Sequence, residues 1–317
     1  MSDPVYTVDL TPPDIRPYRQ GNTGIDYATT FDSGQPGPHV MVNAVTHGNE
    51  LCGAIAVDFL FKQGIRPLHG KLTLSFANIE AYARFDRVNP TASRFVDEDF
   101  NRIWSEEVLD GPRDSVELRR ARQMRPLFDS VDYLLDIHSM QHTTAPLMLC
   151  GPLDKGIALA RALKHPEIVV SDKGHAAGKR LRDYRFFGDP ADPRNALLIE
   201  CGQHWEKSSA TVAIDNALRF LFHFGMIDAA TLNRHVSTET LPPQQIIQVT
   251  EAVTVKNDKF TFAEPYLGLE VIAEKGSLLG HDGDVPVYTP HDRCVLIMPS
   301  RRLTKGQTAV RLGRYLD

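Results

Sequence analysis

The chain has 317 residues, of which 42% are hydrophobic and 24% are charged, so it can bury a sizeable core and has no composition typical of disorder. Its length corresponds to about two domains at roughly 150 residues each, although a single α/β domain can be longer. Asp and Glu outnumber Lys and Arg by 40 to 35, a net charge of -5, which argues against a nucleic-acid-binding surface but does not exclude a small basic pocket.

Residues 1–38 are rich in Pro and Gly and form an N-terminal extension, with one candidate edge strand at residues 27–31. From His39 onward, strand-like and helix-like segments alternate. We expect strands at 39–45, 71–78, 131–139, 145–150 and 196–201, and helices at 50–62, 114–130, 156–164 and 209–225. Such alternation predicts βαβ units around a mixed or parallel sheet, in which ligands bind at the carboxyl ends of strands.

After about residue 235 the pattern changes to short strand-like segments separated by Gly, Pro and Asp, with no helical periodicity. The sequence therefore predicts an α/β catalytic domain at 1–238, with a mixed sheet flanked by helices, and a small all-β C-terminal domain at 239–317.

The cellular setting is predicted from three absences in the sequence. The chain begins without a basic segment followed by an apolar run, and no stretch approaches the roughly 18 apolar residues that cross a bilayer. Cys52, Cys150, Cys201 and Cys294 lie far apart and form no CxxC pair, which predicts free thiols in a reducing compartment. We expect a cytoplasmic protein with no membrane or nucleic-acid partner, and the sequence is compatible with a homo-oligomer.

The first candidate site follows the first apolar strand, in the segment Thr46-His47-Gly48-Asn49-Glu50. A His and a Glu three residues apart lie about 60° apart around a helical turn, so both can reach one ion. Gly48 between them allows the backbone to bend tightly. The alternative is that His47 caps the helix and Glu50 is a surface residue in its first turn.

Two further apolar strands end in residues of the same chemical types. YLLDIHS places His138 at a strand end, and ALLIECG places Glu200 at another, where an unpaired carboxylate is costly to bury. Two histidines and one carboxylate match a catalytic zinc site with an open position for water, although other divalent metals accept the same ligands. The remaining carboxylate would serve as a general base. The alternative for His138 is a hydrogen-bonded core histidine.

A fourth cluster is Ser93-Arg94-Phe95-Val96-Asp97-Glu98-Asp99-Phe100-Asn101-Arg102. Two arginines and an amide near a metal can bind a carboxylate, because guanidinium pairs with it in bidentate geometry. A solvated loop with local ion pairs is the alternative, and the charge pattern does not distinguish the two.

The motifs HGNE (47–50), DFNR (99–102), DIHS (136–139) and IECG (199–202), in this order, resemble those of the succinylglutamate desuccinylase/aspartoacylase family of zinc amidohydrolases. That family is related in fold to zinc carboxypeptidases, and the resemblance spans residues 39 to about 225. The resemblance implies one zinc ion per chain, held by His47, Glu50 and His138. It makes Glu200 the general base and then the acid that protonates the leaving amine, and it gives Arg94 the role of polarising the scissile carbonyl.

The resemblance also implies substrate-binding residues, and here the sequence departs from the family pattern. Asn101 and Arg102 would hold the substrate carboxylate. The family binds a second carboxylate with an arginine upstream of the catalytic Glu, and we take Arg194 as the candidate, although the spacing does not distinguish it from Arg180, Arg182 and Arg185.

Further departures lie near the C-terminus and among the remaining histidines. PSRRLTKG (299–306) replaces the region that carries a substrate-binding tyrosine in some members, and Gln203-His204-Trp205 differs from the animal aspartoacylases. GHAAGKR (174–180) lacks the spacing of a phosphate loop and is predicted to be a flexible, substrate-facing loop. His142, His175, His204 and His291 are predicted to lie at the surface.

We expect a zinc-dependent amidohydrolase that removes an acyl group from a small anionic N-acyl amino acid or a related amide. The alternatives are a zinc metallocarboxypeptidase acting on peptide C-termini and a non-catalytic metal-binding protein. The sequence does not identify the acyl group or the amine.

Overall fold

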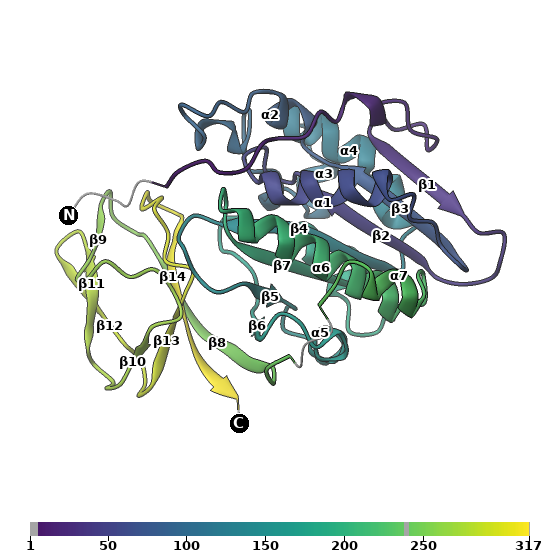
Figure 1. The fold of residues 1–317 in the computed structure, drawn as a ribbon. Helices are drawn as coiled ribbons and strands as arrows, with labels where there is room; N and C mark the ends of the chain where they lie inside the picture. The colour runs from purple at the N-terminus through teal and green to yellow at the C-terminus, as the bar shows by residue number, and fades with distance from the viewer. Residues whose placement is uncertain (1–5, 238–240, 317) are drawn as a thin grey trace.

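The computed structural model describes residues 6–237 and 241–316 and consists of a large mixed sheet with helices on both faces and a second, small sheet (Figure 1). In spatial order the large sheet contains β1 (Ala28–Asp32), β3 (Lys71–Phe76), β2 (His39–Ala44), β4 (Tyr133–Met140), β7 (Asn195–Gln203), β5 (Leu147–Leu149), β6 (Ile168–Ser171), β8 (Gln245–Thr254), β14 (Thr308–Leu316), β13 (Cys294–Ile297) and β10 (Val271–Ile272). The small antiparallel sheet contains β12 (Val285–Tyr288), β11 (Leu278–Asp282) and β9 (Phe260–Phe262).

The helices of the described residues are α1 (Leu51–Lys62), α2 (Ile79–Ala83), α3 (Glu106–Asp110), α4 (Val116–Asp129), α5 (Asp154–Leu163), α6 (Lys207–His223) and α7 (Ala229–Asn233). None of them is long and apolar enough to cross a membrane. Side chains alternate between the two faces of β2. Val40 and Val42 belong to the hydrophobic core that the sheet forms with α1 and α6, and Met41 belongs to a second hydrophobic core with Met124 of α4.

The central strands β3, β2, β4 and β7 run parallel to one another. Almost every residue of β2, β4 and β7 is buried, as expected for parallel strands that have both faces covered by helices. In the register of β4 with β7, His138 lies opposite Glu200. The carboxyl ends of these strands therefore bring the candidate site residues to one edge of the sheet.

The C-terminal part of the described chain, residues 241–316, contains strands and no helix, in agreement with the sequence pattern. It does not form an isolated sheet, because β8 pairs in parallel with β6 and extends the central sheet through β14, β13 and β10. Only β9, β11 and β12 form a separate small sheet (Figure 1). The α/β fold class with a mixed, helix-flanked sheet and a β-rich C-terminal region is thus confirmed.

Candidate active site

His47 and Glu50 lie in the loop between β2 and α1, and not on the helical turn that their spacing predicts. Glu50 is the residue that precedes the first turn of α1, and its backbone N–H donates to the His47 carbonyl at 3.2 Å. The positive φ of Val45, 63°, turns the chain out of β2 just before this loop. A tight turn therefore brings the two side chains together without a helix.

Gly48 is required in this loop because another segment approaches it closely. A Cβ at this position would lie 2.4 Å from both the Ala81 carbonyl carbon and the Ser93 carbonyl oxygen, far inside van der Waals contact. The Gly48 N–H donates to the Arg94 carbonyl at 3.1 Å. The missing side chain thus allows the segment that carries Arg94 to pack against the histidine and glutamate.

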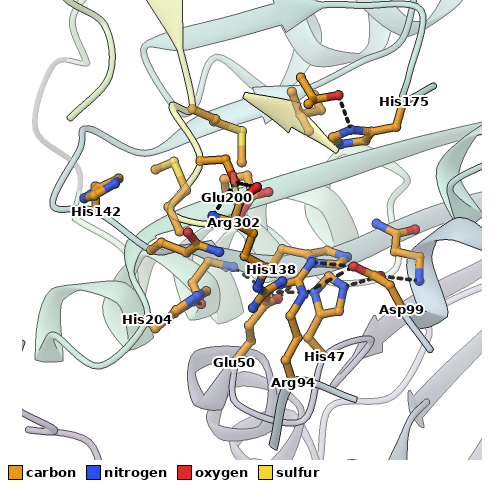
Figure 2. A pocket seen from close by; sticks show the side chains of 18 of the residues that line it. His47, Glu50, Arg94, Asp99, His138, His142, His175, Glu200, His204 and Arg302 are labelled. Atoms are coloured by element: carbon orange, nitrogen blue, oxygen red, sulfur yellow. Dashed lines mark hydrogen bonds and ion pairs between the residues drawn. The ribbon is translucent and has the colours of Figure 1, made fainter. Parts of the chain in front are cut away.

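Three residues form a buried cluster that could hold a metal ion, since one ligand atom from each of His47, Glu50 and His138 lies within 4.8 Å of the others. Glu50 Oε1 lies 2.8 Å from His47 Nδ1, and Oε2 lies 2.9 Å from His138 Nδ1 (Figure 2). Although burial raises the pKa of Glu50, the two imidazoles hold it well below its usual value. The sequence-predicted ligands are therefore together, with the carboxylate between the imidazoles.

The other ring nitrogen of each histidine faces a carboxylate. His47 Nε2 lies 2.9 Å from Asp99 Oδ1, and His138 Nε2 lies 2.8 Å from Asp136 Oδ2. Carboxylates in this position orient a ligating imidazole and make its free nitrogen more basic. Two imidazoles and one carboxylate, each imidazole held by a second carboxylate, are a donor set that fits zinc.

Glu200 lines the same cavity from the carboxyl end of β7. It is 6% exposed, and its Oε2 has no hydrogen-bond partner among the described residues. Burial raises the pKa of Glu200 to about 8, with Glu50 adding to the effect and His138 opposing it. A buried carboxyl group with a pKa near neutrality can both accept and deliver a proton at physiological pH.

Arg94 and Asp99 adjoin this cluster in a loop that one buried carboxylate anchors. Arg94 Nη2 pairs with Asp99 at 2.9 Å, and Nη1 lies 3.3 Å from Glu50. Glu117 of α4, which is fully buried, accepts the consecutive backbone N–H groups of residues 96–98 at 2.7–3.2 Å. Sequence reasoning did not identify Glu117, because an acidic residue in the first turn of a helix is common without such a role.

Asn101 and Arg102 also line the cavity. Asn101 Oδ1 accepts the backbone N–H of Leu181 at 2.9 Å, which fixes the orientation of the amide. Arg102 donates to the Asn101 carbonyl at 2.7 Å, its Nε has no partner, and it makes no ion pair with any described residue. Burial lowers the pKa of Arg102 to about 10, so this unpaired guanidinium remains charged at neutral pH.

Arg194 is not brought to the cavity. It lies just before β7, at the end of the strand opposite to Glu200. Its guanidinium pairs with Asp192 at 2.6 Å and lies 3.1 Å from the centre of the Phe186 ring. Arg194 therefore stabilises the surface at the amino end of the sheet.

The other three candidate arginines also have local partners. Arg180 lines the cavity but pairs with Asp172 at 2.7 Å and with Asp183 at 2.6 Å. Arg182 pairs with Asp183, and Arg185 pairs with Asp129 and Glu106, and neither lines the cavity. None of the four candidates thus combines a place in the cavity with an unpaired guanidinium.

The C-terminal region supplies two arginines that the sequence analysis did not select. Arg311 of β14 lies 3.2 Å from Asp172 and contacts His175. Arg302 lies in the loop between β13 and β14 (Figure 2), and both arginines line the cavity. Only the long-range pairing of the C-terminal strands brings these residues to the site, so no local pattern could have identified them.

Three of the four histidines predicted to lie at the surface instead line the cavity: His142, His175 and His204. His204 is buried, its Nδ1 lies 2.8 Å from Ser139 Oγ, and its Nε2 has no hydrogen-bond partner in the part of the chain that the structure describes. Burial lowers the pKa of His204 to about 3, so its imidazole is neutral. The loop at 174–180 contributes His175 and Arg180 to the cavity.

Two histidines and a glutamate that could hold a metal ion, with a second buried glutamate beside them, form a set of residues that a hydrolase could use. The sequence model of the succinylglutamate desuccinylase/aspartoacylase catalytic domain matches residues 36–222, which is more than half of the chain. The chain therefore belongs to this family of amide-bond hydrolases, and the resemblance of its motifs is confirmed.

Curated relatives and solved structures agree with this assignment. The succinylglutamate desuccinylase of Vibrio cholerae is 21% identical over 287 residues, covering 86% of this chain and 79% of the relative. The structure of the Vibrio parahaemolyticus succinylglutamate desuccinylase superposes with a TM-score of 0.68 at 18% identity, covering 92% of this chain and 87% of the other. The product-bound ectoine utilization protein EutE (DoeB) of Ruegeria pomeroyi has a TM-score of 0.63 at 16% identity, with coverage of 93% and 92%.

Proposed function

We propose that the chain is a zinc-dependent amidohydrolase that removes an acyl group from a small anionic N-acyl amino acid. The observation that carries this proposal is the buried His47–Glu50–His138 cluster with the unpartnered carboxylate of Glu200 beside it. Membership of the family and the names of the succinylglutamate desuccinylases support the type of substrate.

The three clustered side chains would hold one zinc ion per chain. When bound, zinc supplies a Lewis acid that acidifies a water molecule and polarises the scissile carbonyl. Asp99 and Asp136 would keep the proton of each imidazole on Nε2, so that the lone pair of Nδ1 faces the ion.

Glu200 would act as the proton carrier of the reaction. Its unpartnered Oε2 would accept a proton from the attacking water and return it to the nitrogen of the leaving amine. Burial favours the acid form of Glu200, while the neighbouring guanidinium of Arg94 favours the carboxylate, and the resulting balance suits a group that must hold and release a proton within one turnover.

Arginine side chains would orient the substrate. Arg94, which already contacts Glu50, would donate to the scissile carbonyl oxygen as negative charge develops on it. Arg102 would bind the substrate carboxylate with its unpaired guanidinium, and Asn101 would support it. Arg194, which lies outside the cavity, is not assigned to the substrate.

A panel of substrates tests the proposal. The purified, zinc-loaded protein is assayed against N-succinyl, N-acetyl and N-formyl amino acids and against short peptides, with a chelator-treated control. We expect release of the free amino acid from at least one acyl amino acid and loss of this turnover with the chelator. Turnover of peptides alone would support the metallocarboxypeptidase alternative, and no turnover of either class would contradict the proposal.

A further inference from the structure

A row of buried polar side chains crosses three neighbouring strands of the large sheet. Ser75 of β3, Asn43 of β2 and Asp136 of β4 are opposite one another in the register of these parallel strands (Figure 1). All three are fully buried, on the face of β2 that also carries Met41 and is covered by α4. Polar groups in so apolar a sheet are costly to bury unless each of them is hydrogen-bonded.

The carboxylate of Asp136 determines the direction of every hydrogen bond in this row. An ionised carboxylate only accepts, so Asp136 Oδ1 receives Asn43 Nδ2 at 2.8 Å and the Thr46 hydroxyl at 2.9 Å. The amide oxygen of Asn43 then faces β3, where Ser75 Oγ donates to it at 2.6 Å. The two neighbours of Asn43 therefore allow only one orientation of its amide.

The row ends at a proposed metal ligand. Because Asp136 Oδ1 already accepts two hydrogen bonds, Oδ2 is left for His138 Nε2, which lies 2.8 Å away. A proton on Nε2 leaves the lone pair of the neutral ring on Nδ1, the atom that faces Glu50 at 2.9 Å. A continuous chain of hydrogen bonds thus connects Ser75, through Asn43 and Asp136, to the imidazole.

The other histidine of the cluster is supported in a different way. Asp99, which faces His47 Nε2, lies in a loop with its side chain 18% exposed, and it pairs with Arg94 at 2.9 Å. Asp136 lies within β4 and is not exposed, and among the described residues it makes no ion pair with an arginine or a lysine. Neutral donors therefore hold Asp136 in place, whereas a guanidinium holds Asp99.

We propose that Asn43, oriented by Ser75, is a positioning residue that holds Asp136 in the arrangement in which His138 is ready to bind the metal ion. Without the amide, Asp136 Oδ1 would keep only the Thr46 hydroxyl, and the carboxylate would be free to turn away from His138 Nε2. The inference rests on the proposed function, because it concerns the metal site, and it extends that site into the core of the sheet.

Zinc affinity, measured by competition with a chelator on variants that circular dichroism shows to be folded, tests this role without any substrate. Asn43→Leu should weaken zinc binding by about tenfold or more, the factor for one hydrogen bond to a charged group. Ser75→Ala keeps the amide and removes only the group that orients it. Its loss should therefore be smaller, about two- to tenfold, the factor for a hydrogen bond between neutral groups.

Thr73→Val is the matched control for the loss of a buried hydroxyl. Thr73 lies two residues before Ser75 on the same face of β3 and is also fully buried. Its Oγ1 lies 2.7 Å from both His39 Nε2 and Thr30 Oγ1, and none of these contacts leads to the metal-binding cluster. The control should lower the free energy of unfolding and leave zinc affinity unchanged.

A double-mutant cycle distinguishes positioning from a general loss of stability. In an Asp136→Ala background, Asn43→Leu should cause no further loss of zinc affinity, because nothing then connects Asn43 to His138. A folded Asn43→Leu protein with wild-type zinc affinity, or an equal loss with and without Asp136, would overturn the positioning role and leave the proposed function intact. A wild-type protein that binds no zinc would overturn both, and one that binds zinc but hydrolyses no acyl amino acid would contradict only the proposed function.

Discussion

The substitution Asp136→Asn is expected to weaken zinc binding although Asp136 is not one of the proposed ligands. The carboxylate is fully buried and accepts three hydrogen bonds, with Oδ1 bound to Asn43 Nδ2 at 2.8 Å and to Thr46 Oγ1 at 2.9 Å, and Oδ2 bound to His138 Nε2 at 2.8 Å. If the introduced amide keeps its oxygen toward Asn43 and Thr46, its NH₂ group must face His138. Two donors then oppose each other, unless the imidazole proton moves to Nδ1.

The tautomer determines the consequence for the metal. His138 Nδ1 is the atom that faces Glu50, at 2.9 Å, and a protonated Nδ1 has no lone pair for an ion. Loss of such a supporting carboxylate typically costs about 10–100-fold in metal affinity, which is about 1.4–2.7 kcal/mol. We expect a loss in this range for Asp136→Asn, with the fold retained.

A competition titration against a chelator of known zinc affinity measures the effect, and circular dichroism checks that the variant is folded. Asp132→Asn is the matched control, because among the described residues the Asp132 carboxylate accepts only the backbone N–H of His39, at 2.8 Å, near the amino end of β4. Zinc affinity equal to that of the wild type in a folded Asp136→Asn protein would refute the assignment of Nδ1 of His138 as the ligand atom.

Three further predictions concern packing, the active-site loop and pH. Gly48→Ala places a Cβ within 2.4 Å of two backbone atoms and should lower the free energy of unfolding by about 1–3 kcal/mol in urea titrations, and an unchanged midpoint would contradict the close approach. Glu117→Ala leaves three backbone N–H groups without their acceptor and should lower the free energy of unfolding by about 3 kcal/mol or more in the same assay. The variant should also have a lower kcat. A variant as stable as the wild type would show that the loop does not depend on this carboxylate. Burial lowers the pKa of His204 from 6.5 to about 3. Between these two pH values His204 is protonated in the unfolded chain and neutral in the folded chain, so the free energy of unfolding falls as the pH decreases. In the metal-free protein, this one group should cost about 2 kcal/mol of unfolding free energy between pH 7.5 and pH 5, and His204→Asn should remove that part of the pH dependence. An identical pH dependence in the variant would mean that His204 is not buried in its neutral form.

The sequence was most informative where strands end. His138 and Glu200 follow long apolar segments, and parallel strands that end at one edge of a sheet necessarily bring such residues together. The side chains of His47 and Glu50 lie together as their spacing suggested, but a turn and not a helix places them. The four-residue strand β6 was missed, because so short an apolar segment carries little periodic signal.

The arginines show where reasoning along the chain fails. Arg194 is only six residues from Glu200, yet at about 3.3 Å per strand residue this separation is about 20 Å along β7. Arg302 and Arg311 are about a hundred residues from Glu200 in the sequence, and the pairing of β8 with β6 and β14 brings them to the cavity. Long-range strand pairing has no local sequence signature, so the C-terminal contribution to the site could not be predicted.

The most direct test of the proposed function is Glu200→Gln, measured as turnover and zinc content on the same preparation. We expect kcat to fall by at least about 100-fold, which is the smaller end of the contribution of a general base. Bound zinc should stay near that of the wild type, which is about one per chain if the three proposed ligands hold a single ion. Glu107→Gln, an exposed substitution of the same kind in α3, should change neither quantity. A Glu200→Gln protein that retains zinc and hydrolyses acyl amino acids at the wild-type rate would contradict the role of Glu200 as the proton carrier.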